Sequence, residues 1–212
     1  MQFANSETPT VELGGETYQV ELVYADNGSS TDKAPSAASQ LVSEGVSVVL
    51  GSYGSGVSIA AGPIFRDAGI PAMGVTCTNP NVTAGNDYYF RICFLDPFQG
   101  TVLANFAMDN FDAQVAYCLG EAGNEYDQGL IAYFTQAFEA AGGTVITDSP
   151  TTTPTQHLPE QGQERGADVI FTPVSIAYAT QIITQAAKLG IDIPFLAPTP
   201  WTTTRSWRPP RH

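Results

Sequence analysis

The chain is poor in the residues that carry metal, acid–base and nucleic-acid chemistry. Its 212 residues include two histidines and three cysteines, and Cys77, Cys93 and Cys118 do not have the spacing of a metal site. Lysine and arginine total 8 against 21 acidic residues, which gives a formal net charge of −13. Nucleic acids and anionic membranes bind clusters of basic residues, so we expect neither as a partner. We also expect no metal and no cofactor.

Long apolar runs are missing as well. No stretch of about 18 apolar residues is present, so no segment is predicted to span a bilayer. Residues 1–11 lack the charged, apolar and small-residue order of a signal peptide, so we expect no export signal within this chain. The cysteines fall on separate predicted elements, and we therefore predict three free thiols.

What the chain does have is a repeated alternation of strand and helix patterns. Strands are predicted at 18–25, 46–50, 70–75, 87–94, 114–119, 144–147, 168–172 and 194–197, with helical patterns between most of them. The helix that follows 46–50 carries Pro63, where it is predicted to kink or restart. The helix that begins at Asp96 is predicted to turn one apolar face inward, formed by Phe98, Val102, Leu103, Phe106, Ala107 and Phe111. Such alternation is typical of an α/β fold with parallel sheets.

Two segments depart from this alternation. Between Asp148 and Ala167 a crossover helix is required, yet Leu158 is the only large apolar residue of 151–166. The stretch 198–212 holds both tryptophans and no acidic residue in an otherwise acidic chain. We interpret 198–212 as a tail read out of frame, with a genuine terminus as the alternative.

Two clusters of small and hydroxylated residues follow the strands at 46–50 and 70–75. They read GSYGSG at 51–56 and TCTNPN at 76–81. The carboxyl ends of parallel strands meet at one edge of a sheet, where ligands bind in α/β folds. The first cluster leads into a helix start, whose free N–H groups attract a carboxylate or phosphate. The second offers hydroxyl and carbonyl oxygens, so the two clusters together suit a small zwitterion.

Other readings of these residues remain open. Ser55 could only cap its helix, Thr76 and Thr78 could only satisfy a strand end, and Tyr126 could only pack. An enzyme is not expected: the glycines read GxxGxG where dinucleotide binders have GxGxxG, and no GK[ST] phosphate loop is present. The two histidines lie in the two anomalous segments, so a Ser–His–acid triad has no base.

The two clusters, with DYYFRICFLDPFQG at 87–100 and GNEYDQGL at 123–130, resemble the amino-acid-binding periplasmic proteins of ABC importers, the Leu/Ile/Val-binding type I family. The resemblance implies an α/β Venus-flytrap fold of two doubly wound parallel-sheet lobes, at 1–95 and 96–197. It also implies an incomplete first lobe, because the family begins with a strand and helix that this chain lacks and continues beyond the equivalent of residue 197.

The resemblance further implies that an amino acid, branched-chain or a similar small zwitterion, binds between the lobes. The implied ligand-binding residues are Ser55 for the ligand carboxylate, Thr76 and Thr78 beside it, Tyr126 from the opposite lobe, and Ser175. It implies an ABC permease in the membrane as partner, a monomeric receptor, and a periplasmic or extracellular location, with a lipid anchor as one option in the full-length protein. A ligand-sensing domain of a signalling receptor is the alternative.

Overall fold

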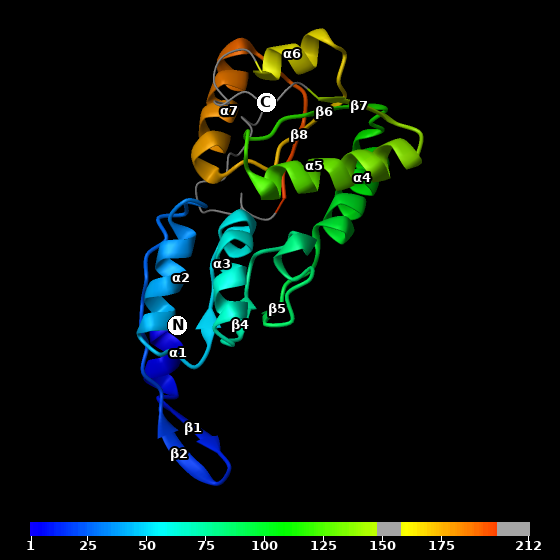
Figure 1. Ribbon diagram of the computed structural model, residues 1–212. Coiled ribbons are helices and arrows are strands. Elements are labelled where there is room, and N and C mark those ends of the chain that lie inside the picture. The colour runs from blue at the N-terminus through cyan, green and yellow to red at the C-terminus, as the bar shows by residue number, and fades with distance from the viewer. Residues whose placement is uncertain (148–157, 199–212) are drawn as a thin grey trace.

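The computed structural model describes residues 1–147 and 158–198, and its strands form two separate parallel sheets and one hairpin (Figure 1). The first sheet has the order β3 (Val49–Leu50), β4 (Ala72–Gly74), β5 (Tyr89–Arg91). The second has the order β7 (Thr144–Thr147), β6 (Val115–Cys118), β8 (Val169–Phe171), β9 (Phe195–Leu196). The predicted α/β class with parallel sheets is confirmed.

The helices divide between the two sheets. With the first sheet go α2 (Ala34–Ser43), α3 (Ser55–Asp67) and the short 3₁₀ helix η1 (Pro80–Val82). With the second go α4 (Asp96–Phe111), α5 (Glu125–Ala140), α6 (Leu158–Glu164) and α7 (Ile176–Leu189). No helix within the described ranges is long and apolar enough to cross a membrane.

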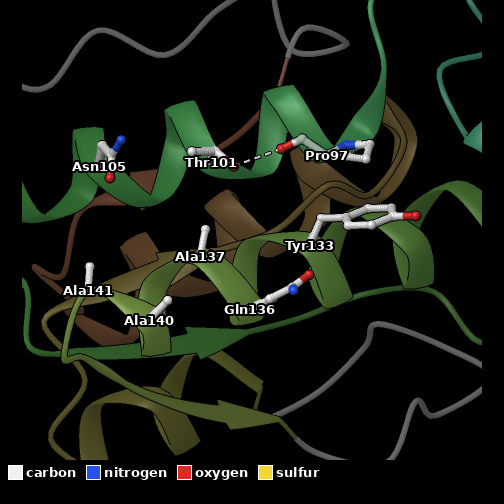
Figure 2. Close-up of a pocket in the computed structure, with 8 residues that line it drawn as sticks. All are labelled: Pro97, Thr101, Asn105, Tyr133, Gln136, Ala137, Ala140 and Ala141. Atoms are coloured by element: carbon white, nitrogen blue, oxygen red, sulfur yellow. Dashed lines mark hydrogen bonds between the residues drawn. The ribbon is translucent and has the colours of Figure 1, made fainter.

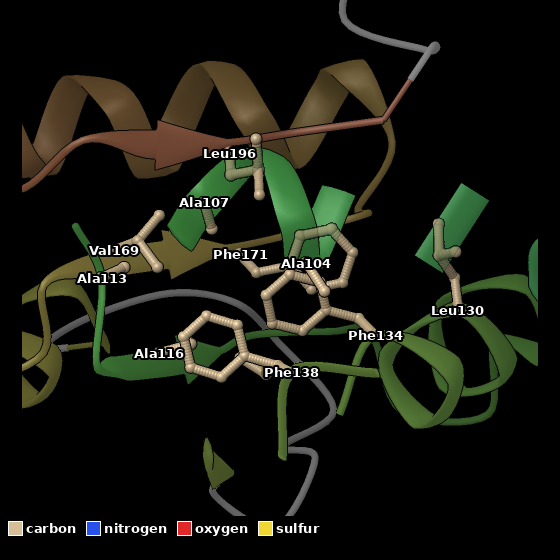
Figure 3. Close-up of a cluster of buried hydrophobic side chains, with 11 residues drawn as sticks. Ala104, Ala107, Ala113, Ala116, Leu130, Phe134, Phe138, Val169, Phe171 and Leu196 are labelled. Atoms are coloured by element: carbon tan, nitrogen blue, oxygen red, sulfur yellow. The ribbon is translucent and has the colours of Figure 1, made fainter. Parts of the chain in front are cut away.

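The second sheet is covered on both faces, as the doubly wound prediction requires. On β6, Ala116 and Cys118 face the cluster built with α4 and α5, while Tyr117 faces the cluster built with α7. Figure 3 shows the first cluster, where the rings of Phe134 and Phe171 stack with centroids 4.2 Å apart. Parallel sheets normally bury both faces, and this sheet does so with these helices alone.

The first sheet is covered on one face only by the described residues. Val49, Ala72 and Tyr89 are buried against α2 and α3. The alternate positions Leu50 and Phe90 point to the other face and are 48% and 50% exposed. The second face of this sheet is therefore open in the part of the chain that the structure describes.

A hairpin replaces part of the strand predicted at 18–25. After α1 (Gln2–Glu7), β1 (Thr10–Leu13) pairs antiparallel with β2 (Glu16–Gln19). The turn between them is Gly14–Gly15, with φ of +60° and +88°, values that favour glycine. The prediction is wrong beyond Gln19 because β-propensity does not supply a partner strand, and 20–27 has none among the described residues.

The predicted inward face of α4 is wrong for its aromatic residues and Val102, and is confirmed for Ala107 and in part for Leu103. Phe98, Val102, Phe106 and Phe111 are exposed, and the buried apolar positions are Gly100, Ala104 and Ala107, with Leu103 partly buried. The cause is a close helix crossing: a Cβ on Gly100 would lie 2.8 Å from the backbone nitrogen of Phe134. At such a distance α5 accepts only small side chains, and the large ones must face outward.

The crossover helix missing from the sequence pattern is present in part as α6. It packs through Gly162, where a Cβ would lie 3.1 Å from the Tyr117 ring, and Gln161 Oε1 accepts a hydrogen bond from the Tyr117 hydroxyl at 3.2 Å. A glycine that packs on a ring needs no large apolar side chain, so hydropathy missed the helix. The residues 148–157 and the tail beyond Pro198 lie outside the described residues. Of the kink or restart expected at Pro63, the restart is wrong, because α3 runs through that residue, and the kink stays a prediction.

Candidate functional site

The N-terminus of α3 is open. Its N-cap is Gly54, which makes no side-chain cap, so the first N–H groups of the helix have no partner within it. Ser55 is the first helical residue and is buried, and its Oγ accepts a hydrogen bond from the backbone N–H of Asn79 at 3.2 Å. Ser55 therefore does not cap its own helix. It joins the first cluster to the second, and the helix end is left free for an anion.

A second bond joins the same two clusters. The Thr76 hydroxyl donates to the main-chain oxygen of Tyr53 at 2.9 Å. Thr76 is exposed, and its hydroxyl oxygen still has lone pairs free to accept. Ser55 and Thr76, both predicted site residues, thus lie at the carboxyl edge of the first sheet. Each is bonded to the loop that carries the other.

Arg91, at the end of β5, stabilises the second cluster and the residues just after it through hydrogen bonds. Its guanidinium donates to the main-chain oxygens of Cys77 at 3.1 Å, Asn79 at 2.8 Å and Pro80 at 3.1 Å, and to Thr83 Oγ1 at 2.6 Å. Charge-assisted bonds of this kind are stronger than neutral ones. Sequence reasoning missed this role, because contacts of a side chain with a backbone 11 to 14 positions away leave no periodic pattern.

The N-terminus of α5 meets these loops from the second sheet. Asn124 caps the helix by accepting from the backbone N–H groups of Tyr126 at 3.1 Å and Asp127 at 3.3 Å. Asn79 Nδ2 donates to the main-chain oxygen of Glu125 at 3.0 Å, so the edges of the two sheets are in contact here. Asn79 was not among the predicted site residues.

Tyr126 lies in this contact region. Gln99 Nε2, from α4, donates to its hydroxyl at 3.2 Å. Burial raises the pKa of the Tyr126 phenol, the Gln99 hydrogen bond lowers it, and the nearby Asp96, Asp127 and Tyr53 raise it further. Tyr126 is partly buried and also packs against the core cluster of the second sheet.

Two buried carboxyl groups lie in the first turns of α4 and α5. Burial raises the pKa of Asp96 to about 6, against the opposing effects of the Thr78 hydroxyl and the Arg91 charge. Burial raises the pKa of Asp127 to about 7, while the backbone N–H of Glu121, which donates to it at 2.8 Å, lowers it. Neither carboxyl was a predicted site residue: Asp96 was assigned only to the start of a helix.

The fifth predicted residue stands apart. Ser175 is the exposed N-cap of α7, just beyond β8, and no hydrogen bond in the described ranges joins it to the other four. It shares only the carboxyl edge of the second sheet with Tyr126. A groove of about 450 Å³ between α4 and α5 holds none of the five, and Figure 2 shows that Pro97, Thr101 and Tyr133 line it.

Comparison with known proteins gives the family. Residues 11–206 match the family described as periplasmic binding protein. Since the match spans most of the chain, the chain belongs to this family, which consists of solute-binding receptors and not of enzymes.

Similar curated proteins include Leu/Ile/Val-binding protein homolog 2 of Brucella abortus, 34% identical over 114 residues that make up 53% of this chain and 30% of that protein. Leu/Ile/Val-binding protein homolog 3 of Brucella melitensis is 29% identical over 129 residues, 60% of this chain and 35% of that protein. The chain therefore spans about a third of the length of the curated relatives it matches.

Solved structures agree. The leucine-binding protein LivK of Thermotoga maritima is 31% identical, with a TM-score of 0.86 over 92% of this chain and 56% of that one. LivJ of Streptococcus pneumoniae, solved in complex with isoleucine, is 27% identical, with a TM-score of 0.79 over 92% of this chain and 55% of that one. The predicted family and fold are confirmed.

Proposed function

We propose that this chain is the ligand-binding part of a solute receptor of an ABC importer and binds an amino acid, branched-chain or a similar small zwitterion, between two lobes at 1–95 and 96–197. The observation that carries the proposal is the hydrogen bond from Asn79 Nδ2 to the Glu125 oxygen. It lies where the open helix end at Ser55, the Thr78 loop and Tyr126 converge from the two sheets. Similarity to a leucine-binding protein and to an isoleucine complex supports the ligand class.

The chemistry of the site suits both ends of a zwitterion. The ligand carboxylate would accept from the first N–H groups of α3 and from the Ser55 hydroxyl. The ammonium would donate to oxygens of Thr76 and Thr78, and Tyr126 would cover the ligand. Each charge-assisted hydrogen bond is worth about 1.5–3 kcal/mol. Ser175, the N-cap of α7, is the fifth residue that we propose to contact the ligand, and it would do so from the α7 side of the site.

We further propose that the partner is a permease in the membrane, that the receptor acts as a monomer in the periplasm or outside the cell, and that it catalyses no reaction. The neutral hydroxyl and amide groups of the site hold a ligand without supplying a nucleophile–base pair. Uptake of the bound amino acid by vesicles that carry the permease would test the partner.

Calorimetric titration of the 212-residue chain with a panel of free amino acids tests the ligand. We expect binding of leucine, isoleucine or valine, weakened by about 1–3 kcal/mol in Ser55→Ala and in Thr78→Ala. Ser39→Ala is the matched control, since Ser39 is an exposed helical serine of α2 that bonds only Pro35. Failure of the whole panel to bind would refute the proposed function, and unchanged affinity in both variants would remove those residues from the site.

A further inference from the structure

Thr78 and the start of α4 together hold a group of buried polar atoms without hydrogen-bond partners. Within the described ranges, Thr78 Oγ1, both carboxyl oxygens of Asp96 and Gln99 Oε1 have none. Asp96 is 0% exposed and Thr78 6%. Polar atoms buried in this way are rare and costly, so their arrangement calls for a physical explanation.

Thr78 and Asp96 are held next to each other. The backbone N–H of Asp96 donates to the main-chain oxygen of Thr78 at 3.1 Å, which ties the first turn of α4 to the second cluster. The Thr78 hydroxyl is near enough to act on the Asp96 carboxyl by hydrogen bonding, although the bond is not closed in the structure.

We infer that Asp96 is a positioning residue that sets the direction of the Thr78 hydroxyl. Its ionised carboxylate accepts the hydroxyl proton in a hydrogen bond, so that the lone pairs of Thr78 Oγ1 face the ligand ammonium. A protonated Asp96 instead donates to Thr78 Oγ1 and occupies one of its two lone pairs, so the hydroxyl keeps its own proton and has less acceptor capacity left for the ammonium, which weakens binding. This inference rests on the proposed function and adds a charged group that acts on the ligand through Thr78.

Asp96 is the group in this region that we expect to change charge near pH 6, because its neighbours do not compete with it there. Its pKa is raised to about 6 by burial, and the positive charge of Arg91, from β5, opposes this rise. Burial raises the pKa of Cys93, just before α4, and that of Tyr126, on α5, so both stay neutral there. Asp127, the next residue of α5, has a pKa raised to about 7 and must be separated by experiment.

The affinity for L-leucine between pH 5 and pH 8 is the test. The ligand stays zwitterionic over this range, so we expect the affinity of the wild-type chain to rise about five- to tenfold as Asp96 ionises. Asp96→Asn should be weak and flat with pH, and Thr78→Val should lose the step although Asp96 is intact. Thr78→Ser should keep it. Asp127→Asn is the matched control, a second buried carboxyl without the tie to Thr78, and should keep the step near pH 6.

A step that persists in Asp96→Asn or in Thr78→Val overturns the inference, as does an affinity that falls with rising pH. Should Asp96→Asn fail to fold, Thr78→Val decides. A ¹³C NMR titration of the aspartate carboxyls without ligand provides a separate readout: the Asp96 pKa should rise in Thr78→Val, and an unchanged pKa overturns the inference. Binding without a pH step refutes this inference alone. Absence of binding at every pH refutes the proposed function and, with it, the effect on the ligand.

Discussion

Asn79 and Glu125, 46 positions apart in the sequence, are joined by a hydrogen bond of 3.0 Å from the Asn79 side-chain nitrogen to the Glu125 main-chain oxygen. The same Asn79 side chain accepts from the backbone N–H of Asn81 at 2.9 Å with its oxygen. One amide thus closes the turn of the second cluster and contacts the helix end of the other sheet. Gly129 makes room for it, since a Cβ there would lie 2.7 Å from Asn79 Nδ2.

Asn79→Asp separates these two roles. The carboxylate keeps an oxygen for Asn81 but loses the donor to Glu125, so the variant should lose about 1–3 kcal/mol of unfolding free energy. Urea unfolding followed by circular dichroism measures the change. Asn81→Asp, at the exposed neighbouring position, adds the same charge and should have little effect. Equal losses in the two variants would contradict the importance of the contact between the sheets.

The crossing of α4 and α5 leads to a prediction at Gly100. Alanine normally stabilises a helix interior relative to glycine by about 1 kcal/mol. Here Gly100→Ala should destabilise the protein by about 1–3 kcal/mol, because the added methyl group would lie 2.8 Å from the backbone of α5. Thermal unfolding compares it with Thr101→Ala, an exposed neighbour on the same helix. An unchanged or higher Tm in Gly100→Ala would show that the helices are not in such close contact.

The two buried carboxyls predict a pH dependence of stability. Both have a pKa raised from the ordinary 3.8, to about 6 for Asp96 and about 7 for Asp127. A carboxyl with a raised pKa in the folded state stabilises the fold below its unfolded pKa, and this contribution is lost as pH rises through the folded pKa. The unfolding free energy should therefore fall between about pH 4 and pH 8. Each tenfold difference between the acid constants of the folded and unfolded states contributes about 1.4 kcal/mol to that fall.

Asp127→Asn removes one of the two titrations and should reduce that fall. Chemical denaturation at several pH values measures this fall in unfolding free energy. Asp168→Asn is the control, because Asp168 lies just before β8, away from Asp127, and its carboxylate accepts from the backbone N–H groups of Gln114 and Val115. A pH profile of stability in Asp127→Asn that matches the wild type would contradict the raised pKa.

The cysteines are free thiols in the structure, and the folded chain should expose them unequally. Cys77 and Cys118 are buried, while Cys93 is partly exposed. Burial raises the pKa of Cys118, which slows its reaction further. We expect Ellman's reagent to modify Cys93 first in the folded protein and to count three thiols in urea without reductant. A count of one would reveal a disulfide.

The sequence predicts those parts of the fold that depend on local patterns. The strands β4, β5 and β6 and the presence of helix α4 after β5 follow local patterns, although the face that α4 buries does not, and the two clusters follow strands whose carboxyl ends share an edge. For this reason Ser55, Thr76 and Thr78 could be grouped from the sequence alone. Their individual roles as ligand-binding residues remain predictions.

What the sequence did not predict depends on contacts between distant segments. The face of α4 is decided by how closely α5 approaches, and α6 packs through a glycine. Three further residues donate hydrogen bonds to main-chain oxygens many positions away in the sequence, namely Arg91, Asn79 and Asp96. No rule based on residue spacing predicts such contacts. The strand expected at 18–25 failed for the same reason, since a partner strand is a property of the whole chain.

The four hydrogen bonds of Arg91 have a further consequence for ligand binding. They hold the loop at 77–83 in place without a ligand, so in the proposed receptor this loop would not have to become ordered on binding. Groups that are preorganised lose little conformational entropy on binding, and more of the interaction energy is left as affinity. In the proposed receptor, the entropic cost of binding would then fall mainly on the α5 side, where the Tyr126 hydroxyl accepts a neutral hydrogen bond from Gln99.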